Sequence, residues 1–385
     1  MGRRGFLWAV AAAPSIVFAD DAANAPAIES VELMRSGERR FVEVRDTEGT
    51  VGRTPANNRL PLTPRMFRRL VADYFVGKPL GGRADLGRLV DGVYYSGDER
   101  GSVYKFAGMP FWNAVAHVEV ACWDLLGRRA GRPVGELLGG RRRDAVDVYI
   151  SEFGRETTAE QEVENAERDL EKTGATAVKL KVGLRMRTTP EQTRRDRRMI
   201  ELARGRWGGA VTVYVDANGS YDAAGAVEMG RFLDDHGVAL FEEPLPWQDR
   251  RGTREVTGAL AGRAIRVAGG EQDSSLYDWA EMAERRVVDV LQPDVFYNGG
   301  LVRTLRVAAL AKRHGRPLTP HSPKVLPEAA ATLQLLSCVE GLGPFQEYRS
   351  YGTVKDGRVA IPAGPGLGVD DGWYRRDAAK AVRTD

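Results

Sequence analysis

The sequence predicts a (β/α)8 barrel of the TIM type, preceded by a smaller α+β region. From about residue 144 onward, short β-rich runs alternate with helical runs over roughly 200 residues, which is the pattern of such a barrel. The first of these runs is not followed by the glycine-rich phosphate loop that a doubly wound sheet normally carries. The chain has 385 residues, of which 43% are hydrophobic, so it can form two domains with a large buried core.

The α+β region comes first along the chain. Residues 28–52 are predicted to form a short β-hairpin unit, because apolar residues recur along it and Asp46 to Gly49 supply a turn. Residues 63–138 are predicted to be mostly helical. Within them, Phe111 to Arg128 is apolar at helical spacing and should form one long helix.

The barrel region is predicted to hold eight strands. They are expected at Val146–Ile150, Ala177–Val182, Val211–Asp216, Val238–Glu242, Ile265–Ala268, Val287–Leu291, Pro317–His321 and Phe345–Glu347. Helical runs separate these strands. Residues 190–204 are one such run, since Thr189 can cap the helix N-terminus and Pro190 suits the first helical position.

The N-terminus has the features of a targeting segment. Arg3 and Arg4 form a twin-arginine pair, and the apolar stretch that follows, up to Phe18, is too short to span a bilayer comfortably. We therefore expect residues 1–25 to be a twin-arginine export signal and the mature protein to be periplasmic or extracellular. A disordered or membrane-anchoring N-terminus is the alternative, and without a working signal the protein would be cytoplasmic.

The composition argues against several partners and site types. The net charge is +3, and acidic and basic residues are nearly balanced along the chain, so no surface for nucleic acid stands out. No segment after the N-terminal stretch is predicted to span a membrane. The two cysteines form no C-x-x-C pair, which gives zinc and thiol-redox sites no support. We expect the protein to be a homo-oligomer.

Polar residues follow most of the predicted strands, at the rim where barrel enzymes place their catalysis. They are Lys179 and Lys181, Asp216 and Asn218, Glu242, Glu271, Asp294, His321 and Glu347. A lone Asp at a strand end is more often a helix cap, and a lone His is usually structural. From Asp216 onward, however, the set recurs about once per barrel repeat. This recurrence predicts that consecutive strands bring these groups to one rim.

Three of these residues form a predicted metal site. Asp216, Glu242 and Glu271 supply the carboxylate oxygens that Mg²⁺ prefers, and Mn²⁺ can substitute for it. A metal ion there would bind the carboxylate of a small-molecule substrate and stabilise the enediolate that forms when the neighbouring carbon loses a proton. The expected reaction is therefore proton abstraction next to a carboxylate.

Two basic groups are predicted beside the metal site. Lys181 can act as a base if its pKa is lowered, and Lys179 together with the metal would lower that pKa by like charge. We expect strict alternation to place the two lysines on different faces of their strand, with only the barrel rim bringing them close. Asp294 can orient His321, and this pair is the predicted second acid or base.

In combination, these motifs resemble the enolase superfamily and, within it, the mandelate racemase subgroup. The motifs are ACWDLLG at 121–127, GRPVGELLGG at 131–140, Lys179-x-Lys181, DAN at 216–218, EEP at 242–244, GGE at 269–271, QPD at 292–294, His321 and PGLGV at 365–369. The muconate-cycloisomerase side of the superfamily uses Asp as its third ligand and a Lys on strand six. Glu271, and the lack of a Lys directly after Asp294, favour the mandelate racemase pattern.

The resemblance implies an architecture and a role for each residue. It implies a capping domain at residues 26–140, a barrel at 141–352 and a tail at 353–385 that returns to the cap. It also implies metal ligands, two catalytic bases with their partners, and a group that hydrogen-bonds the substrate carboxylate. The implied metal ligands are Asp216, Glu242 and Glu271. The implied bases are Lys181, with Lys179 as its electrostatic partner, and His321, with Asp294 as its partner. Glu347 is the group that would hydrogen-bond the substrate carboxylate.

One segment departs from the family pattern. The first hairpin, Glu32 to Arg40, is shorter than the family usually has there, and that loop normally covers the substrate. Residues 53–60 are therefore expected to supply more of the lid. The substrate-binding residues that we expect are Asn57, Asn58 and Arg59 from this lid and Asn218 from the barrel.

Two bases on opposite faces of a substrate permit two reactions. In the dehydration of a hydroxylated sugar acid to a 2-keto acid, one base takes the α-proton and the other assists loss of the β-hydroxyl. In a racemase or epimerase, each base serves one face. Many acid-sugar dehydratases share this constellation, so dehydration is the function that we expect, with racemase or epimerase as the alternative. A non-catalytic binding protein on the same scaffold is a third alternative, against which the complete set of ligands and bases argues.

Overall fold

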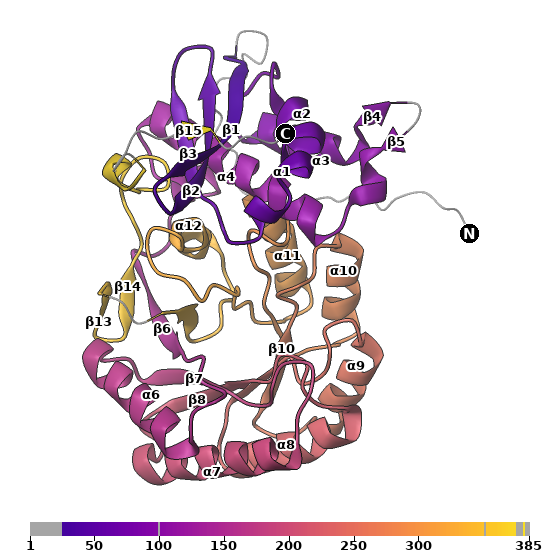
Figure 1. Ribbon diagram of the computed structural model, residues 1–385, viewed down its shortest axis with the longest axis vertical. Coiled ribbons are helices and arrows are strands. Elements are labelled where there is room, and N and C mark those ends of the chain that lie inside the picture. Colours follow the sequence, from indigo (N-terminus) through magenta and orange to yellow (C-terminus); the bar gives the residue numbers. More distant parts are fainter. Residues whose placement is uncertain (1–24, 99–100, 350–351, 375–379, 382–385) are drawn as a thin grey trace.

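The computed structural model describes residues 25–98, 101–349, 352–374 and 380–381. Figure 1 shows an α+β cap, built by the N-terminal third of the chain, above a barrel. The C-terminal segment, in yellow, runs from the barrel back to the cap. The predicted export signal, apart from Ala25, lies outside the described residues.

An antiparallel sheet forms one side of the cap. Its strands are β1 (Ile28–Ser36), β2 (Arg39–Asp46), β3 (Val51–Pro55) and β15 (Lys380–Ala381), in the order β15-β1-β2-β3. The turn predicted at Asp46 to Gly49 joins β2 to β3, so the predicted hairpin unit is part of a larger sheet. Val31 and Leu33 of β1 are buried while Glu32 between them is partly exposed, and Val42, Glu43 and Val44 of β2 alternate in the same way, because successive side chains of a strand point to opposite faces.

The rest of the cap is mostly helical, as predicted. Its elements are η1 (Leu60–Leu62), α1 (Pro64–Met66), η2 (Phe67–Ala72), α2 (Asp73–Phe75), α3 (Arg83–Tyr95), β4 (Gly97–Asp98), β5 (Gly101–Ser102), η3 (Val103–Phe106), α4 (Met109–Ala130) and α5 (Val134–Leu137). The helix predicted at residues 111–128 is α4, and its side chains are buried along most of its length. Asp124 on α4 accepts hydrogen bonds from the backbone N–H groups of Arg53 (2.8 Å) and Leu367 (2.7 Å). One helix thus ties β3 and the C-terminal segment together.

The predicted barrel is confirmed: parallel strands β6 to β11 are hydrogen-bonded in sequence order, and β12 pairs with β6. The strands are β6 (Ala145–Ser151), β7 (Ala177–Lys181), β8 (Thr212–Asp216), β9 (Leu240–Glu242), β10 (Arg266–Gly269), β11 (Val290–Leu291) and β12 (Gln346–Tyr348). The strand predicted at residues 317–321 is wrong in extent, since Leu318 alone bridges the segments on either side. Pro317 and Pro320 lack the N–H groups that a longer strand would need.

Helices alternate with these strands and form the outer layer of the barrel (Figure 1). They are α6 (Ala159–Thr173), α7 (Pro190–Trp207), α8 (Ala223–Asp235), α9 (Arg250–Ala259), α10 (Leu276–Glu284), α11 (Leu301–Arg313) and α12 (Ala330–Cys338). The N-cap predicted at Thr189 is present, because Thr189 Oγ1 accepts a hydrogen bond from the Gln192 N–H at 3.1 Å. Across the described ranges, no helix is long and apolar enough to cross a membrane.

The C-terminal segment contacts both parts of the molecule. Strands β13 (Val354–Lys355) and β14 (Arg358–Ala360) form a hairpin whose second strand pairs with the start of β6. The chain then reaches the cap, where η4 (Asp371–Trp373) is followed by Tyr374, whose ring lies 5.1 Å from that of Phe41. The segment therefore begins at the barrel and ends on the cap sheet.

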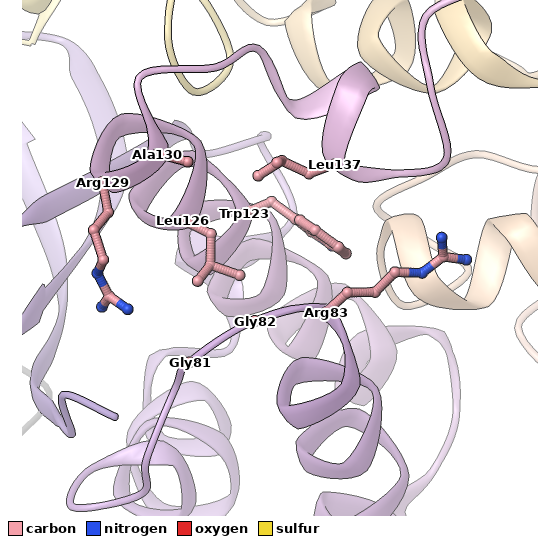
Figure 2. A pocket seen from close by; sticks show the side chains of 8 residues that line it. All are labelled: Gly81, Gly82, Arg83, Trp123, Leu126, Arg129, Ala130 and Leu137. Carbon is pink, nitrogen blue, oxygen red and sulfur yellow. The ribbon is translucent and has the colours of Figure 1, made fainter. Parts of the chain in front are cut away.

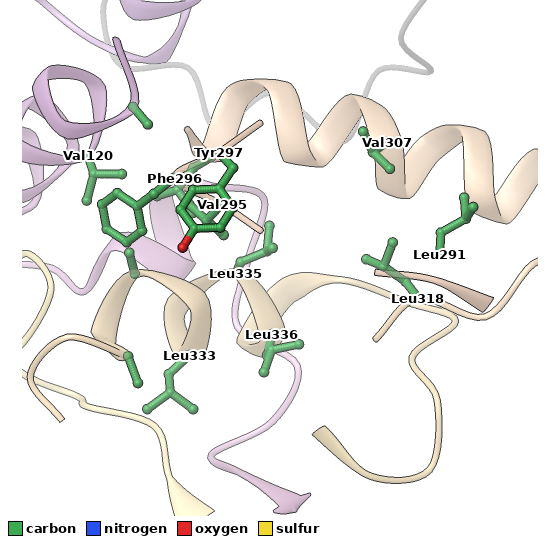
Figure 3. Close-up of a cluster of buried hydrophobic side chains, with 14 of the residues drawn as sticks. Val120, Leu291, Val295, Phe296, Tyr297, Val307, Leu318, Leu333, Leu335 and Leu336 are labelled. Atoms are coloured by element: carbon green, nitrogen blue, oxygen red, sulfur yellow. The ribbon is translucent and has the colours of Figure 1, made fainter. Parts of the chain in front are cut away.

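Contacts between α4 and the barrel hold the cap over the rim. Figure 3 shows Val120 of α4 beside Phe296, which follows β11, and the Phe296 ring lies 4.6 Å from that of His117. Glu119 of α4 accepts hydrogen bonds from the backbone N–H groups of Leu301 and the next residue, at 2.9 and 2.8 Å. These two residues begin α11. Since each barrel helix begins near the rim where the preceding strand ends, the contacts place the cap above the carboxyl ends of the strands.

Candidate active site

Three carboxylates meet where β8, β9 and β10 end. Asp216 and Glu242 are the last residues of β8 and β9, and Glu271 lies just after β10. All three are buried, and one oxygen of each lies within 4.8 Å of one oxygen of the others. Glu242 Oε1 is buried without a hydrogen-bond partner among the described residues, so it is available as a ligand. This donor set fits a hard divalent cation such as Mg²⁺.

Lys179 and Lys181 on β7 both lie beside these carboxylates. The expectation that they lie on different faces is wrong, because residues two apart in a strand share a face. Lys179 Nζ lies 2.8 Å from Glu242 Oε2 and 2.6 Å from Glu347 Oε1, whereas Lys181 Nζ hydrogen-bonds Asp216. Burial disfavours the charged form of Lys179, but the two glutamates outweigh it and hold the pKa of Lys179 well above its usual range. Lys179 is therefore a fixed positive charge.

A lysine contacts Asp216 and Glu242 alike, but their pKa values differ because Glu242 also faces the negative charges of Asp216 and Glu347. Burial raises the pKa of Glu242 to about 7, although Lys179 opposes the shift. Burial also disfavours the charged form of Asp216, but Lys181 and Lys179 outweigh it and hold the pKa of that carboxyl below its usual range. Asp216 is thus ionised at neutral pH, as a metal ligand must be.

His321 and Asp294 form a hydrogen-bonded pair. His321 Nδ1 lies 2.9 Å from Asp294 Oδ2, and His321 Nε2 lies 3.1 Å from Glu271 Oε2. Burial disfavours the imidazolium, but Glu271 and the other nearby carboxylates outweigh it and raise the pKa of His321 to about 9. Asp294 Oδ1 accepts a hydrogen bond from the Phe296 N–H at 2.7 Å, and Lys324 Nζ lies 3.6 Å from Asp294 Oδ2. Asp294 is thus held in one orientation, and it directs Nε2 of His321 toward the triad.

The two predicted bases stand at opposite ends of the carboxylate triad. Lys181 contacts Asp216 at one end, and His321 contacts Glu271 at the other. In the order of the sheet, β7 precedes the three ligand-bearing strands, and His321 comes after them. A substrate held at the triad would therefore meet one base from each side.

Glu347, on β12, lies between the lysine strand and the segment that carries His321. Its Oε1 atom contacts Lys179 at 2.6 Å, and its Oε2 atom accepts a hydrogen bond from the Ser322 N–H at 2.8 Å. Burial disfavours the charged form of Glu347, but Lys179 and His321 outweigh it and lower the pKa of Glu347 to about 2. The structure thus brings this predicted residue to the site as well.

Among the predicted lid residues, the geometry favours Arg59 as a substrate-binding group. Arg59 Nη1 donates to Gln272 Oε1 at 3.0 Å, and its Cζ lies 3.7 Å from the centroid of the Tyr297 ring. Both partners belong to the barrel rim. Asn57 is instead bound within the cap, where its Nδ2 donates to a side chain of α4 at 2.6 Å. Asn58 is exposed.

Asn218 lies beside the carboxylate triad. Two residues that were not predicted also contact the site: one hydrogen-bonds Asn218 and the other hydrogen-bonds Glu242. Asn218 donates from its backbone N–H (2.8 Å) and from Nδ2 (3.1 Å) to Asp216, and its Oδ1 accepts from buried Arg155 at 2.5 Å. Gln292 Nε2 donates to Glu242 Oε2 at 2.8 Å. Gln292 belongs to the QPD motif and could have been found there. Arg155 stands in an irregular segment after β6, where nothing in the pattern marks it.

A pocket of about 220 Å³ lies in the cap and is separate from these residues (Figure 2). It is lined by Gly81, Gly82, Arg83, Trp123, Leu126, Arg129, Ala130 and Leu137. None of these is a predicted site residue. Its two arginines already donate to the backbone carbonyls of Leu138 (3.0 Å) and Leu80 (2.8 Å), and the other lining side chains are apolar. This lining holds no carboxylate, lysine or histidine, so the pocket offers no group for binding a metal ion or abstracting a proton.

The barrel, its buried carboxylate triad and the basic group at each end of that triad define the class of metal-dependent barrel enzymes. The chain belongs to the enolase C-terminal domain-like family, whose model matches residues 161–371. The predicted membership of the enolase superfamily is thus confirmed.

Curated relatives of this chain include two enzymes of sugar-acid metabolism. A D-galactarolactone cycloisomerase from Agrobacterium fabrum is 29% identical over 70% of this chain and 74% of its own length. An arabinonate dehydratase from Saccharolobus solfataricus is 26% identical over 69% of this chain and 72% of its own. Among solved structures, a mandelate racemase/muconate lactonizing protein from Paracoccus denitrificans, complexed with magnesium, is 27% identical. The structural match covers 94% of this chain and 100% of the Paracoccus protein, with a TM-score of 0.81.

Proposed function

We propose that this protein is a Mg²⁺-dependent lyase that dehydrates a hydroxylated sugar acid to a 2-keto acid. The observation that carries the proposal is the placement of Lys181 and His321 at opposite ends of one carboxylate triad. One group can remove the α-proton while the other protonates the departing β-hydroxyl. The α C–H bond and the β C–O bond break, water leaves, and the resulting enol tautomerises to the ketone.

Asp216, Glu242 and Glu271 would hold the metal, and Mn²⁺ should be able to replace Mg²⁺ because it accepts the same oxygen ligands. A divalent ion bound there would supply positive charge to the substrate carboxylate as the α-proton leaves. The protein's own groups do the rest. Lys179 remains a fixed cation between two glutamates, and Asp294 holds His321 by its Nδ1 so that Nε2 faces the substrate.

The relatives support this reaction class. One is named an arabinonate dehydratase, and at 26% identity it matches 69% of this chain. An isomerase is the second candidate, because another relative is named a D-galactarolactone cycloisomerase and is 29% identical. The same two bases could return a proton to the opposite face of the substrate, as a racemase or epimerase requires.

One experiment decides between the two reactions. The purified protein is incubated with Mg²⁺ and a panel of sugar acids in D₂O, and both the 2-keto product and α-deuterium incorporation are measured. A dehydratase forms the 2-keto acid, whereas a racemase or epimerase exchanges the α-proton and inverts the centre without losing water. If no acid gave either signal, the proposed function would be wrong.

We also propose that the protein is exported and forms a homo-oligomer. Export is inferred from Arg3, Arg4 and the apolar stretch after them. Mass spectrometry of protein recovered from its host should find a mature N-terminus near residue 25, and an intact N-terminus would refute export. Light scattering of the purified protein should give a multiple of the chain mass, whereas a monomer mass would refute the oligomer.

A further inference from the structure

We infer that Arg59 binds a second anionic group of the substrate, so that the preferred substrate is a sugar acid with a carboxylate at each end. The inference rests on the proposed function, since it names the substrate class for the same site. It starts from the position of Arg59, which is the point at which the lid hydrogen-bonds to the barrel rim.

Hydrogen bonds and ring contacts connect Arg59 to the catalytic groups. Arg59 donates to Gln272, and Gln272 Nε2 donates to Glu271 Oε1 at 2.7 Å, so one side chain separates the guanidinium from a metal ligand. The Tyr297 ring, on which Arg59 stacks, has its centroid 6.1 Å from that of His321. Arg59 therefore lies on the Glu271 and His321 side of the triad.

The charge of Arg59 has no carboxylate partner within the described structure, whereas some other arginines of the cap do. Arg53 pairs with Glu43 at 2.8 Å, and Arg128 pairs with Asp124 at 2.6 Å. Arg59 donates from Nη1 alone, to an amide oxygen and to the sulfur of a methionine. Its Nε and Nη2 have no hydrogen-bond partner among the described residues and are not buried. One edge of the guanidinium is thus free to receive a ligand.

A free guanidinium edge selects for a particular ligand chemistry. Two parallel N–H donors match the two oxygens of a carboxylate, and such charged pairs are stronger than hydrogen bonds to neutral hydroxyls. Stacking on Tyr297 and the bond to Gln272 fix the plane of the guanidinium before the substrate arrives, so little side-chain freedom is lost on binding. Lys324 lies on the same side, but it is already close to Asp294. Arg59 is therefore the cation that a distal carboxylate would meet.

The test compares pairs of acids that differ only in the distal group, such as glucarate with gluconate and galactarate with galactonate. The wild-type protein should have the higher kcat/KM for the dicarboxylate of the accepted pair. Arg59→Gln should lower kcat/KM for the dicarboxylate about 10- to 100-fold, which is the typical worth of a charged hydrogen bond, and change the monocarboxylate value by less than about threefold. Arg65→Gln, which removes an exposed arginine from α1, serves as the control and should change neither value.

The ratio of kcat/KM for the dicarboxylate to kcat/KM for the monocarboxylate shows whether Arg59 binds substrate or has only a structural role. If Arg59 only held the lid against Gln272, Arg59→Gln would lower both rates by the same factor, and the inference would be wrong. A wild-type preference for the monocarboxylate would also overturn it. Calorimetric binding of both acids to the Mg²⁺-loaded protein adds a readout independent of turnover. If neither pair were turned over but the dicarboxylate bound more tightly through Arg59, the proposed function would fail while the anion site remained.

Discussion

At the scale of single residues, the two lysines of β7 differ in what surrounds them. The Lys179 side chain is fully buried between Glu242 and Glu347, whereas the Lys181 side chain keeps 7% exposure and has Asp216 as its partner. Burying a charge is costly unless partners compensate, and removing the partner of a buried charge costs more than the pair gains. Lys179 is therefore suited to a fixed electrostatic role, and Lys181, at the accessible edge, to proton transfer.

Replacing Lys179 should destabilise the protein as well as inactivate it. Lys179→Met leaves Glu242 and Glu347 without their shared cation, so we expect the free energy of unfolding to fall by about 3–5 kcal/mol. Urea denaturation of the metal-free protein measures the change. Lys172→Met, at an exposed position of α6, should stay within about 0.5 kcal/mol of the wild type. Equal stability of both variants would contradict the role given to Lys179.

Replacements of the two bases should not be equivalent in a dehydratase. Without the base that makes the enediolate, α-deuterium exchange should stop, whereas without the other base exchange can persist while 2-keto product is lost. We expect losses of about 10²–10⁴-fold for Lys181→Ala and for His321→Asn, and the double variant should not multiply them. Proton NMR in D₂O follows both signals. Unchanged turnover in both single variants would contradict the roles of Lys181 and His321 as catalytic bases.

At the scale of elements, α4 joins separate parts of the molecule through two buried carboxylates. Asp124 receives N–H groups from β3 and from the C-terminal segment, and Glu119 receives those at the start of α11. An acidic group at a helix N-terminus satisfies N–H groups that have no partner within the helix. Glu119 is nevertheless fully buried, so the stability of the cap–barrel contact depends on its ionisation.

Glu119 should make stability depend on pH. Burial raises its pKa to about 7, against the opposing effect of the N–H groups of Val302 and Leu301 and of Trp123. A carboxyl whose pKa is higher in the folded state stabilises the protein fully below the ordinary glutamate range, about 4.3, and that contribution is lost as pH rises through about 7. The free energy of unfolding should therefore fall between about pH 5 and 7. Denaturation of Glu119→Gln at several pH values should show a smaller slope, and an unchanged slope would contradict the assignment.

At the scale of the whole molecule, the candidate metal site exists only because three strands end at one rim. The ligands Asp216, Glu242 and Glu271 are separated by complete strand–helix repeats, yet their oxygens lie within 4.8 Å of one another. The cap covers the same rim through α4 and Arg59. The carboxylate triad and the predicted lid thus meet where the two parts of the chain join.

Activity and thermal stability should both depend on a divalent ion. We expect a chelator to abolish turnover and Mg²⁺ or Mn²⁺ to restore it. Because a ligand that binds the folded state alone stabilises it, Mg²⁺ at 100 times its Kd should add about 2.7 kcal/mol to the free energy of unfolding and thereby raise the Tm. Asp216→Asn should weaken that rise, which differential scanning calorimetry measures. Full turnover in chelator would refute the metal site.

The sequence by itself determined the barrel, the three carboxylates and the two basic groups. Strand and helix periods are local properties, and a polar residue at the end of a parallel strand reaches the rim whatever the details of packing. Asp216, Glu242, Glu271 and His321 could therefore be placed from their spacing. Thr189 was also predictable, because a helix cap depends on its own first turn.

Tertiary structure alone decided the contacts between segments that are distant in the chain. Arg155 reaches Asn218, Glu119 reaches α11, and Arg59 rather than Asn57 reaches the barrel rim. No local pattern marks Arg155 or Glu119 or separates Arg59 from Asn57, because a hydrogen bond between distant segments depends on how two surfaces dock. The short seventh strand of the barrel is also a result of tertiary structure. Leu318 alone bridges Leu291 and Leu342, and the barrel closes through this one residue.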